Sequence, residues 1–337
     1  MSVKIILRKR TKTSFRKSLK TTVLVLASLI LVVTISLGFV GNYYYDIAIN
    51  AGVDREAMIK NLRKEDARSE SKTEITDRAQ SDAEFIFNIT ETGEDVRIKS
   101  RDGLNLHALE MLNRGGGHKW VIVVHGYNSD SFKMKSEGTK FSQMGYNVLM
   151  PDLRGCGESQ GEAFGMGWLD RIDMLDWIDY IISKDSNAEI VLYGVSMGGA
   201  TVMMTTGEPL PKNVKAAIED CGYTSAKAEF EGKLMDFFGL PSFPVITAAD
   251  VVCLFRAGYT FEQASSVEQL KKSVTPTLFI HGDNDSFVPF YMLEELYAAA
   301  ACPKEMLAVK GAGHFGSSTS EPELYWDTVE KFLNKYV

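Results

Sequence analysis

The fold of this chain is decided by the stretch Ile190-Val191-Leu192-Tyr193-Gly194-Val195-Ser196-Met197-Gly198. Its apolar, β-branched beginning predicts a strand, and a strand that runs through G-x-S-x-G into a helix turns sharply and holds the serine hydroxyl at the top of a sheet. A side chain at either glycine of the motif would collide with the neighbouring strand or helix. An ordinary glycine-rich turn is the alternative, but the strand before the motif and the small residues after it favour Ser196 as a nucleophile.

A serine nucleophile needs a base to accept its proton and a third group to orient that base. Enzymes with this elbow carry the acid and then the histidine after the serine. Two of the five histidines, His281 and His314, follow Ser196. His281 ends an apolar run, which predicts a packing residue at a strand end. His314 lies in the loop Gly311-Ala312-Gly313-His314-Phe315 after a strand-like run, so we predict that His314 is the base.

Two aspartates precede this loop in the run His281-Gly282-Asp283-Asn284-Asp285-Ser286-Phe287-Val288-Pro289. The elbow, this H-G-x-x-D-x-x-V-P run and the G-x-G-H loop together resemble the α/β-hydrolase superfamily. More narrowly, they resemble its bacterial branch of membrane-anchored serine esterases and serine-aminopeptidase-like proteins, over residues 91–337.

The resemblance implies an α/β-hydrolase fold, with a mostly parallel eight-stranded sheet flanked by helices. It places the catalytic acid at the later aspartate, Asp285. Asp283 is then a turn residue whose side chain caps backbone amides. Asp220, after a strand-like run, stays the alternative acid, because some lipases of this fold place the acid there.

A further apolar run, residues 120–124, ends in His125-Gly126-Tyr127-Asn128. In this fold one oxyanion donor is the backbone N–H after the nucleophile, here that of Met197. The resemblance assigns the second donor to the backbone N–H of Tyr127. Such donors typically contribute ~2.7–4 kcal/mol each. The phenol of Tyr127 is a further donor candidate, and the alternative is that its ring only packs against the cap.

The N-terminus differs in charge from the rest of the chain. Residues 1–20 contain eight Lys or Arg and no acid, and residues 21–45 carry no charge. About 20 apolar residues span ~30 Å of hydrocarbon, and the basic flank stays in the cytoplasm. We therefore predict a basic cytoplasmic tail (1–20), an uncleaved membrane anchor (21–41) and a catalytic domain outside the cytoplasm. A cleaved signal peptide is the alternative, since Ser36-Leu37-Gly38 loosely fits a cleavage site.

Without its basic tail the chain keeps 29 of its 37 Lys and Arg against 44 Asp and Glu, a net charge of −15. So acidic a domain is a poor partner for nucleic acid and is repelled by anionic lipid headgroups. No C-x-x-C spacing is present, and we predict neither a metal nor a cofactor. In the fold's usual strand order Cys156 and Cys221 are ~14 Å apart, beyond the ~7 Å reach of a disulfide. We therefore expect the cysteines to be thiols.

Several connecting segments have a recognisable character. Residues 42–90 are largely charged and glycine-poor, which predicts a helical, solvated juxtamembrane stalk, with a partner-binding helix as the alternative. Residues 225–272 are rich in phenylalanine, and insertions at this point of the fold form a helical cap, here an apolar cover for an acyl-binding pocket. Apolar residues at helical spacing over 168–182 predict a surface helix, with its aspartates on the solvent side. We also expect a first antiparallel strand pair joined at Arg101-Asp102-Gly103.

The sequence thus predicts a serine hydrolase that cleaves carboxylic esters through an acyl-enzyme, with a small-molecule ester as substrate and the bilayer as partner of the N-terminal helix. A serine aminopeptidase or acyltransferase with the same residues, and a non-catalytic binding module of the same fold, stay open. No carboxylate is recognisable that would bind a peptide's ammonium group. We therefore expect short or medium acyl esters to be better substrates than aminoacyl amides or very long acyl esters.

Overall fold

The computed structural model describes residues 2–53, 93–113, 115 and 117–337, with side chains from Ser18 onward. Its strands are β1 (Gly93–Lys99), β2 (Asn105–Met111), β3 (Lys119–Val124), β4 (Asn147–Pro151), β5 (Glu189–Val195), β6 (Val214–Asp220), β7 (Thr277–Gly282) and β8 (Lys304–Val309). They form one sheet in the order β1-β2-β4-β3-β5-β6-β7-β8. β2 is antiparallel to β1 and β4, and all other neighbours are parallel. This confirms the predicted sheet.

Helices cover both faces of the sheet because its central strands are apolar on both sides. Along β3, Val121 and Val123 point to one core and Ile122 and Val124 to the other, as the two-residue period of a strand requires. The first core is closed by α4 (Lys135–Gln143) and α12 (Pro322–Leu333), and the second by α5 (Asp170–Lys184) and α6 (Met197–Thr206). The sheet is therefore the middle layer of three.

Five further helices lie in connections between strands: η1 (Ser131–Met134), α7 (Ala226–Phe238), α8 (Ser242–Ala257), α9 (Ser266–Leu270) and α10 (Tyr291–Ala299). The short helix α11 (Ser317–Ser320) lies between β8 and α12. α7 and α8 occupy the segment between β6 and β7 in which we expected a cap. The Ser225 hydroxyl accepts a hydrogen bond from the Ala228 N–H and so caps the start of α7, and Gly239 ends that helix in the left-handed conformation. We call α7, α8 and the turn between them the cap.

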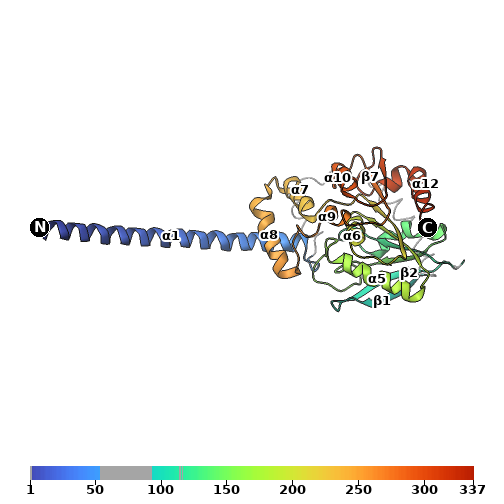
Figure 1. Ribbon diagram of the computed structural model, residues 1–337, viewed down its shortest axis with the longest axis horizontal. Coiled ribbons are helices and arrows are strands. Elements are labelled where there is room, and N and C mark those ends of the chain that lie inside the picture. Colours follow the sequence, from blue (N-terminus) through green and yellow to red (C-terminus); the bar gives the residue numbers. More distant parts are fainter. Residues whose placement is uncertain (1, 54–92, 114, 116) are drawn as a thin grey trace.

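The N-terminal helix α1 (Ser2–Ala48) projects from the end of the domain that carries the cap (Figure 1). Its part from Ser18 to Ala48 is long and apolar enough to cross a membrane. The stalk that we expected from residue 42 is not solvated at its start. Tyr45 and Ile49 are 2% and 0% exposed, and the Ile49 carbonyl accepts a hydrogen bond from the Phe164 N–H at 2.9 Å. Aromatic and apolar side chains fix this end of α1 to the domain, and residues 54–90 of the expected stalk lie outside the described residues.

Candidate active site

Ser196 lies in the turn between β5 and α6 with φ 56° and ψ −117°, a conformation that is strained for a residue with a side chain. Its N–H donates to the Asp220 carbonyl oxygen of the neighbouring strand at 2.8 Å, which holds the turn. A Cβ on Gly198 would overlap the carbonyl groups of Val124 and His125, so this turn requires the glycine. The turn is the sharp elbow predicted from the sequence.

His314 lies between Ser196 and Asp285 in the loop that follows β8. Its Nε2 is 3.0 Å from Ser196 Oγ, and its Nδ1 is 2.7 Å from Asp285 Oδ2. With Nδ1–H donating to the carboxylate, Nε2 accepts from the serine hydroxyl. The rings of Phe287 and Phe315 pack against the imidazole, with centroids 4.9 Å and 4.3 Å away. The structure thus brings together the three residues predicted as nucleophile, base and acid.

The Asp285 carboxylate is held by two backbone N–H groups of the turn after β7 and by the imidazoles of His281 and His314. Its Oδ1 accepts from the N–H groups of Phe287 and Val288 at 2.8 and 2.9 Å. Burial alone would raise the pKa of Asp285, but hydrogen bonds from His281 and His314 hold this pKa well below its usual range. Asp285 therefore stays ionised, as a group that stabilises an imidazolium must.

The other two acids considered from the sequence have different contacts. Asp283 Oδ1 accepts from the Gly311 N–H at 2.5 Å and ties the turn after β7 to the loop that carries His314. Asp220 is buried and accepts from the Ser317 hydroxyl at 3.1 Å, and burial raises the pKa of Asp220 to about 6. Among the three aspartates, Asp285 is the one that is hydrogen-bonded to His314.

Two further histidines, which were not predicted to take part in the reaction, hold the loops that carry the site residues. His281, expected as a packing residue, is buried with Nε2 2.9 Å from the Val288 carbonyl oxygen and 3.3 Å from Asp285 Oδ2. His125 accepts from the Leu153 N–H at its Nε2 and donates from Nδ1 to the Gly126 carbonyl oxygen at 2.7 Å. Burial lowers the pKa of His125, which keeps this imidazole neutral and able to make both bonds.

The two residues predicted as oxyanion donors flank the serine. Met197 is the first residue of α6, so its N–H belongs to the helix N-terminal groups that have no intrahelical partner. Tyr127 follows β3, and both residues lie at the carboxyl ends of adjacent parallel strands. The phenol of Tyr127 does not point to Ser196 as a donor: it donates to the Ala48 carbonyl oxygen at 2.8 Å and so caps the end of α1.

A pocket of about 380 Å³ lies over Ser196 and is mostly apolar. The cap supplies much of its wall, and the end of α1 supplies the rest of that side. The lining residues are Tyr44, Ile47 and Ala48 of α1, Glu229, Phe230, Lys233, Leu234, Phe237, Phe238, Ile246 and Ala249 of the cap, and Tyr127, Asn128, Met166, Tyr223, Phe261, Phe287 and Val288 of other segments. The contribution of α1 was not predicted, because it depends on contacts between residues about 200 positions apart.

Two buried polar side chains in this pocket make no hydrogen bond within the described part of the chain. They are the Glu229 carboxyl group and the Tyr223 hydroxyl. Glu229 is 6% exposed, and burial raises its pKa to about 7, with Lys233 lowering it only in part. Sequence reasoning missed Glu229, since an acid in the first turns of a helix is ordinary. The pocket therefore holds one buried carboxyl group available to a ligand.

One group of side chains has the spacing of a metal site. The ligand atoms of Cys221, Asp285 and His314 lie within 4.8 Å of one another. Burial raises the pKa of the Cys221 thiol well above its ordinary value, whereas a metal ion binds the thiolate. Asp285 and His314 are already hydrogen-bonded to each other at 2.7 Å, so the group fits an aspartate–histidine pair beside a buried thiol better than a metal centre. All four cysteines are buried and none is joined to another by a disulfide.

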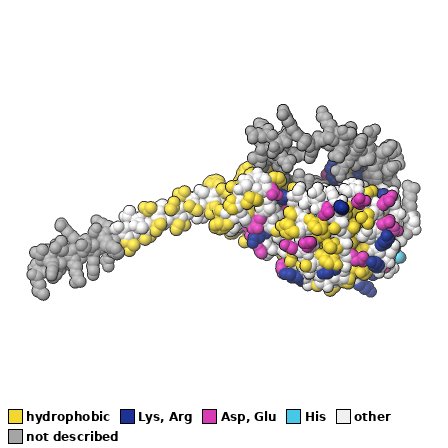
Figure 2. Space-filling view, turned by 90° about the horizontal axis from the view of Figure 1, so that it is seen from above, with side chains coloured by type: hydrophobic (Ala, Val, Ile, Leu, Met, Phe, Trp, Pro, Cys, Tyr) yellow, Lys and Arg dark blue, Asp and Glu magenta, His cyan; other side chains and the backbone are white. Residues whose placement is uncertain are grey.

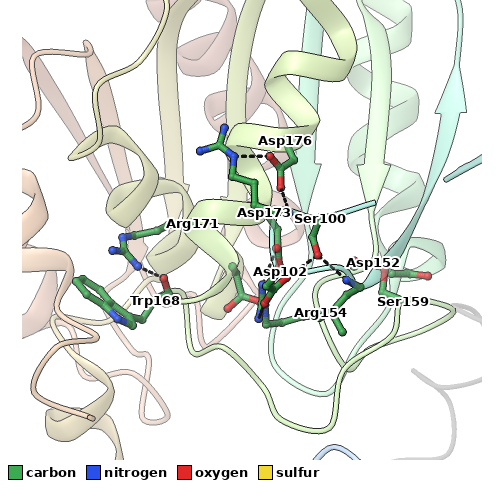
Figure 3. Close-up of polar contacts among 12 residues, drawn as sticks. Ser100, Asp102, Asp152, Arg154, Ser159, Trp168, Arg171, Asp173 and Asp176 are labelled. Atoms are coloured by element: carbon green, nitrogen blue, oxygen red, sulfur yellow. Dashed lines mark hydrogen bonds and ion pairs between the residues drawn. The ribbon is translucent and has the colours of Figure 1, made fainter. Parts of the chain in front are cut away.

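The loop after β4 is fixed to α5 and to the β1–β2 turn by the ion pairs of Arg154 (Figure 3). Arg154 donates to both carboxylate oxygens of Asp173 on α5, at 2.8 and 2.6 Å, and to Asp102 in the β1–β2 turn at 3.0 Å. The expectation that the α5 aspartates lie on the solvent side is therefore wrong for Asp170 and Asp173, which are buried. Asp173 turns inward because the buried Arg154 guanidinium requires a charged partner. Asp170 turns inward to accept a hydrogen bond from the Gly167 N–H at 2.8 Å.

Comparison with known proteins gives the same fold. Residues 117–234 match the family model described as serine aminopeptidase, S33. An uncharacterized protein of Bacillus subtilis, YqkD, is 26% identical over 215 residues, which cover 64% of this chain and 70% of the relative. The alpha/beta hydrolase domain-containing protein WAV2 of Arabidopsis thaliana is 27% identical over 72% of this chain and 79% of its own length.

Among solved structures, an esterase of Pyrococcus furiosus superposes with a TM-score of 0.62 at 22% identity, covering 74% of this chain and 93% of that one. An acetyl xylan esterase from Paenibacillus sp. R4 superposes with a TM-score of 0.56 at 18% identity, covering 72% and 83%. The chain has the α/β-hydrolase fold, and the resemblance read from its motifs is confirmed.

Proposed function

We propose that this chain is a membrane-anchored serine hydrolase that cleaves carboxylic esters through an acyl-enzyme. The observation that carries the proposal is the line of hydrogen bonds from Asp285 through His314 to Ser196, at 2.7 and 3.0 Å, beneath a mostly apolar pocket. The hydrolase family model and the esterases among proteins of the same fold support it. This arrangement is the one by which a serine hydroxyl becomes nucleophilic near neutral pH.

In the proposed reaction Ser196 Oγ attacks the ester carbonyl carbon while its proton moves to His314 Nε2. The negative charge that forms on the carbonyl oxygen is held by the N–H groups of Met197 and Tyr127. Asp285, ionised throughout, keeps Nδ1–H oriented and stabilises the imidazolium. His314 then protonates the departing alcohol, and a water molecule activated by the same imidazole releases the acid and restores Ser196.

We assign α1 as the anchor, with the basic N-terminus in the cytoplasm and the hydrolase domain on the other side. Support comes from the eight basic residues before the apolar span and from the length of that span. A cleaved signal peptide is the competing assignment, which the fractionation described in the Discussion separates.

A serine aminopeptidase is a second candidate function, and one observation favours it. From the sequence we expected no carboxylate that could bind a substrate ammonium group. Glu229 is such a carboxylate: its buried carboxyl group lines the pocket and has no hydrogen-bond partner among the described residues. A carboxylate in that position would offset the cost of burying an ammonium group. The family model described as serine aminopeptidase points the same way.

The test uses the full-length protein in detergent, treated with a fluorophosphonate probe that reacts with activated serines. We expect labelling of the wild type and none of Ser196→Ala, with a loss of ester turnover on the order of 10⁶. Unlabelled wild-type protein would favour the non-catalytic binding module. The ratio of kcat/KM for a butyryl ester and an alanyl anilide then decides between esterase and aminopeptidase.

A further inference from the structure

We infer that the exposed apolar face of the cap lies in the membrane leaflet beside the domain, and that the substrate is an acyl ester of a lipid in that leaflet. The inference rests on the proposed function, since it names the substrate class of the same site. Three features carry it: an apolar surface on the cap, the position of that surface along α1, and the path from it to Ser196.

The cap exposes more apolar surface than packing in a soluble domain explains. Seven of its apolar side chains are between 39% and 84% exposed: Met235, Phe237, Leu240, Phe243, Val251, Leu254 and Phe255. On α8 the exposed residues Val251, Leu254 and Phe255 follow helical spacing, while Ile246 and Ala249 on the opposite side are buried and line the pocket. Clusters of this kind on monomers mark interaction sites. We call these seven residues the cap face.

The contact between α1 and α8 sets the depth of the cap face. A Cβ on Gly41 would lie 2.5 Å from the Ala248 carbonyl oxygen, so the two helices are in backbone contact there. Arg256 Nη1 reaches Asn42 Oδ1 and Asp46 Oδ1, both at 2.8 Å, and fixes the crossing. About 20 helical residues from Thr21 cover the ~30 Å hydrocarbon core. The crossing therefore falls where the hydrocarbon ends.

At that depth α8 has the position of an interfacial helix. Such helices bury their apolar side ~5–10 Å into the boundary between headgroups and acyl chains. α8 crosses α1 at the end of the domain from which the anchor emerges (Figure 1). Hydrophobic side chains along α1 continue onto the adjoining end of the domain in Figure 2. The cap face is thus continuous with the membrane-spanning surface, which identifies lipid rather than a second protein as its occupant.

The pocket reaches this same face. Phe237 lines the pocket and is also 55% exposed as part of the cap face. Tyr44 and Ile47 of α1 and Ile246 of α8 form the adjoining wall, so the way from the leaflet to Ser196 is apolar. An ester that enters from the leaflet needs to place only the part of its acyl chain nearest the carbonyl in the pocket. A long acyl chain is therefore compatible with a pocket of about 380 Å³, contrary to the expectation from the sequence.

The depth is tested with the full-length protein in phosphatidylcholine nanodiscs and a nitroxide on Phe255→Cys. Val274→Cys is the matched control, because Val274 is 83% exposed but precedes β7, at the opposite end of the sheet from Ser196. The four native cysteines are buried, so we expect them not to react with the nitroxide reagent, and the wild-type protein serves as the control for background labelling. We expect the label at 255 to collide with oxygen and not with a water-soluble nickel chelate, and the label at 274 to do the reverse. Equal access of the chelate to both labels would overturn the membrane position.

The substrate class is tested with Phe255→Asp, again with Val274→Asp as control. Two esters are compared: water-soluble p-nitrophenyl butyrate and a diacyl phosphatidylcholine in the same nanodiscs. We expect Phe255→Asp to reduce hydrolysis of the lipid ester at least tenfold and that of the butyrate less than twofold. Equal loss on both esters with an unchanged melting temperature, or no loss on either, would overturn the inference.

Failure of the proposed function gives a different result. In that case wild-type protein hydrolyses neither ester and is not labelled by the fluorophosphonate, whatever the position of residue 255. If the wild type cleaves the butyrate and not the lipid ester, the serine hydrolase stands and the lipid substrate is wrong.

Discussion

Asp283 and Asp285 are two residues apart in one turn, but only Asp285 contacts His314, so we expect only Asp285 to matter for the rate of ester hydrolysis. Asp285 binds His314 Nδ1, whereas Asp283 holds the backbone N–H of Gly311. We predict that Asp285→Asn lowers kcat by on the order of 10⁴, because the imidazole loses the partner that selects its tautomer. Asp283→Asn removes one charged acceptor from an exposed loop and serves as the control, with less than a tenfold effect.

Steady-state kinetics of both variants on a butyryl ester check this assignment. A large loss for Asp283→Asn with a small one for Asp285→Asn would move the acid to Asp283. Small losses in both would point to Asp220, the alternative that the sequence left open.

Glu229 gives a second prediction at the scale of one residue, and it concerns pH. Because burial raises the pKa of this carboxyl group to about 7, Glu229 is neutral below that pH and charged above it. A buried charge without a partner disfavours an apolar ligand. For a butyryl ester we therefore expect the wild-type KM to rise several-fold between pH 6 and pH 8, and that of Glu229→Gln to stay level.

The same variant separates the two candidate functions. For an alanyl anilide the carboxylate pairs with the substrate ammonium, so wild-type binding improves as the pH rises through 7 and Glu229→Gln loses this gain. Dividing the kcat/KM values of wild type and variant at each pH cancels every pH effect that the two proteins share. A ratio that does not change with pH for either substrate would remove Glu229 from substrate binding.

At the scale of elements, the end of the proposed anchor helix α1 also forms a wall of the pocket. Its Gly41 touches the backbone of α8, so Gly41→Leu must force the two helices apart, at a cost of ~1–3 kcal/mol for overpacking. We predict at least a tenfold loss of butyryl ester hydrolysis, because Tyr44, Ile47 and Ala48 move away from the site.

Gly38→Leu is the matched control for this prediction, since a Cβ there meets nothing within 4 Å. Both substitutions make α1 equally more apolar, so membrane insertion is the same in the two variants. Activity and melting temperature are measured on the full-length proteins in detergent. If Gly41→Leu behaves like Gly38→Leu, the contact between α1 and the cap does not shape the pocket.

α5 shows why some elements were predictable and others were not. Its helical span follows from local spacing, but two of its aspartates are buried by contacts with other segments: Asp173 pairs with Arg154, and Asp170 accepts from the Gly167 N–H. The elbow at Ser196 and the turn at Asp285 are encoded within a few residues, so the sequence alone located them. The position of Ile47 and Ala48 in the pocket wall and the burial of Glu229 depend on tertiary contacts, which cannot be predicted from a local sequence pattern.

At the scale of the whole molecule, charge and shape divide the chain into two ends. Eight basic residues lie at the free end of α1, and the rest of the chain, residues 21–337, carries a net charge of −15, with the acidic domain beyond the apolar span (Figure 1). The positive-inside rule orients such a chain with its N-terminus in the cytoplasm. The acidic domain would then face the outside, held against the bilayer by α1 rather than by attraction to anionic lipids.

This topology predicts that protease added to intact protoplasts digests the hydrolase domain, while a cytoplasmic marker protein survives as the control. Survival of the domain would reverse the orientation. Cleavage of a signal peptide after Gly38 would leave Tyr44, Ile47 and Ala48 in the chain and thus in the pocket, so ester hydrolysis alone does not distinguish an anchor from a signal. Fractionation does: an uncleaved α1 keeps the activity in the membrane fraction after a high-salt wash, and activity released into the medium with a shortened chain would show that α1 is removed.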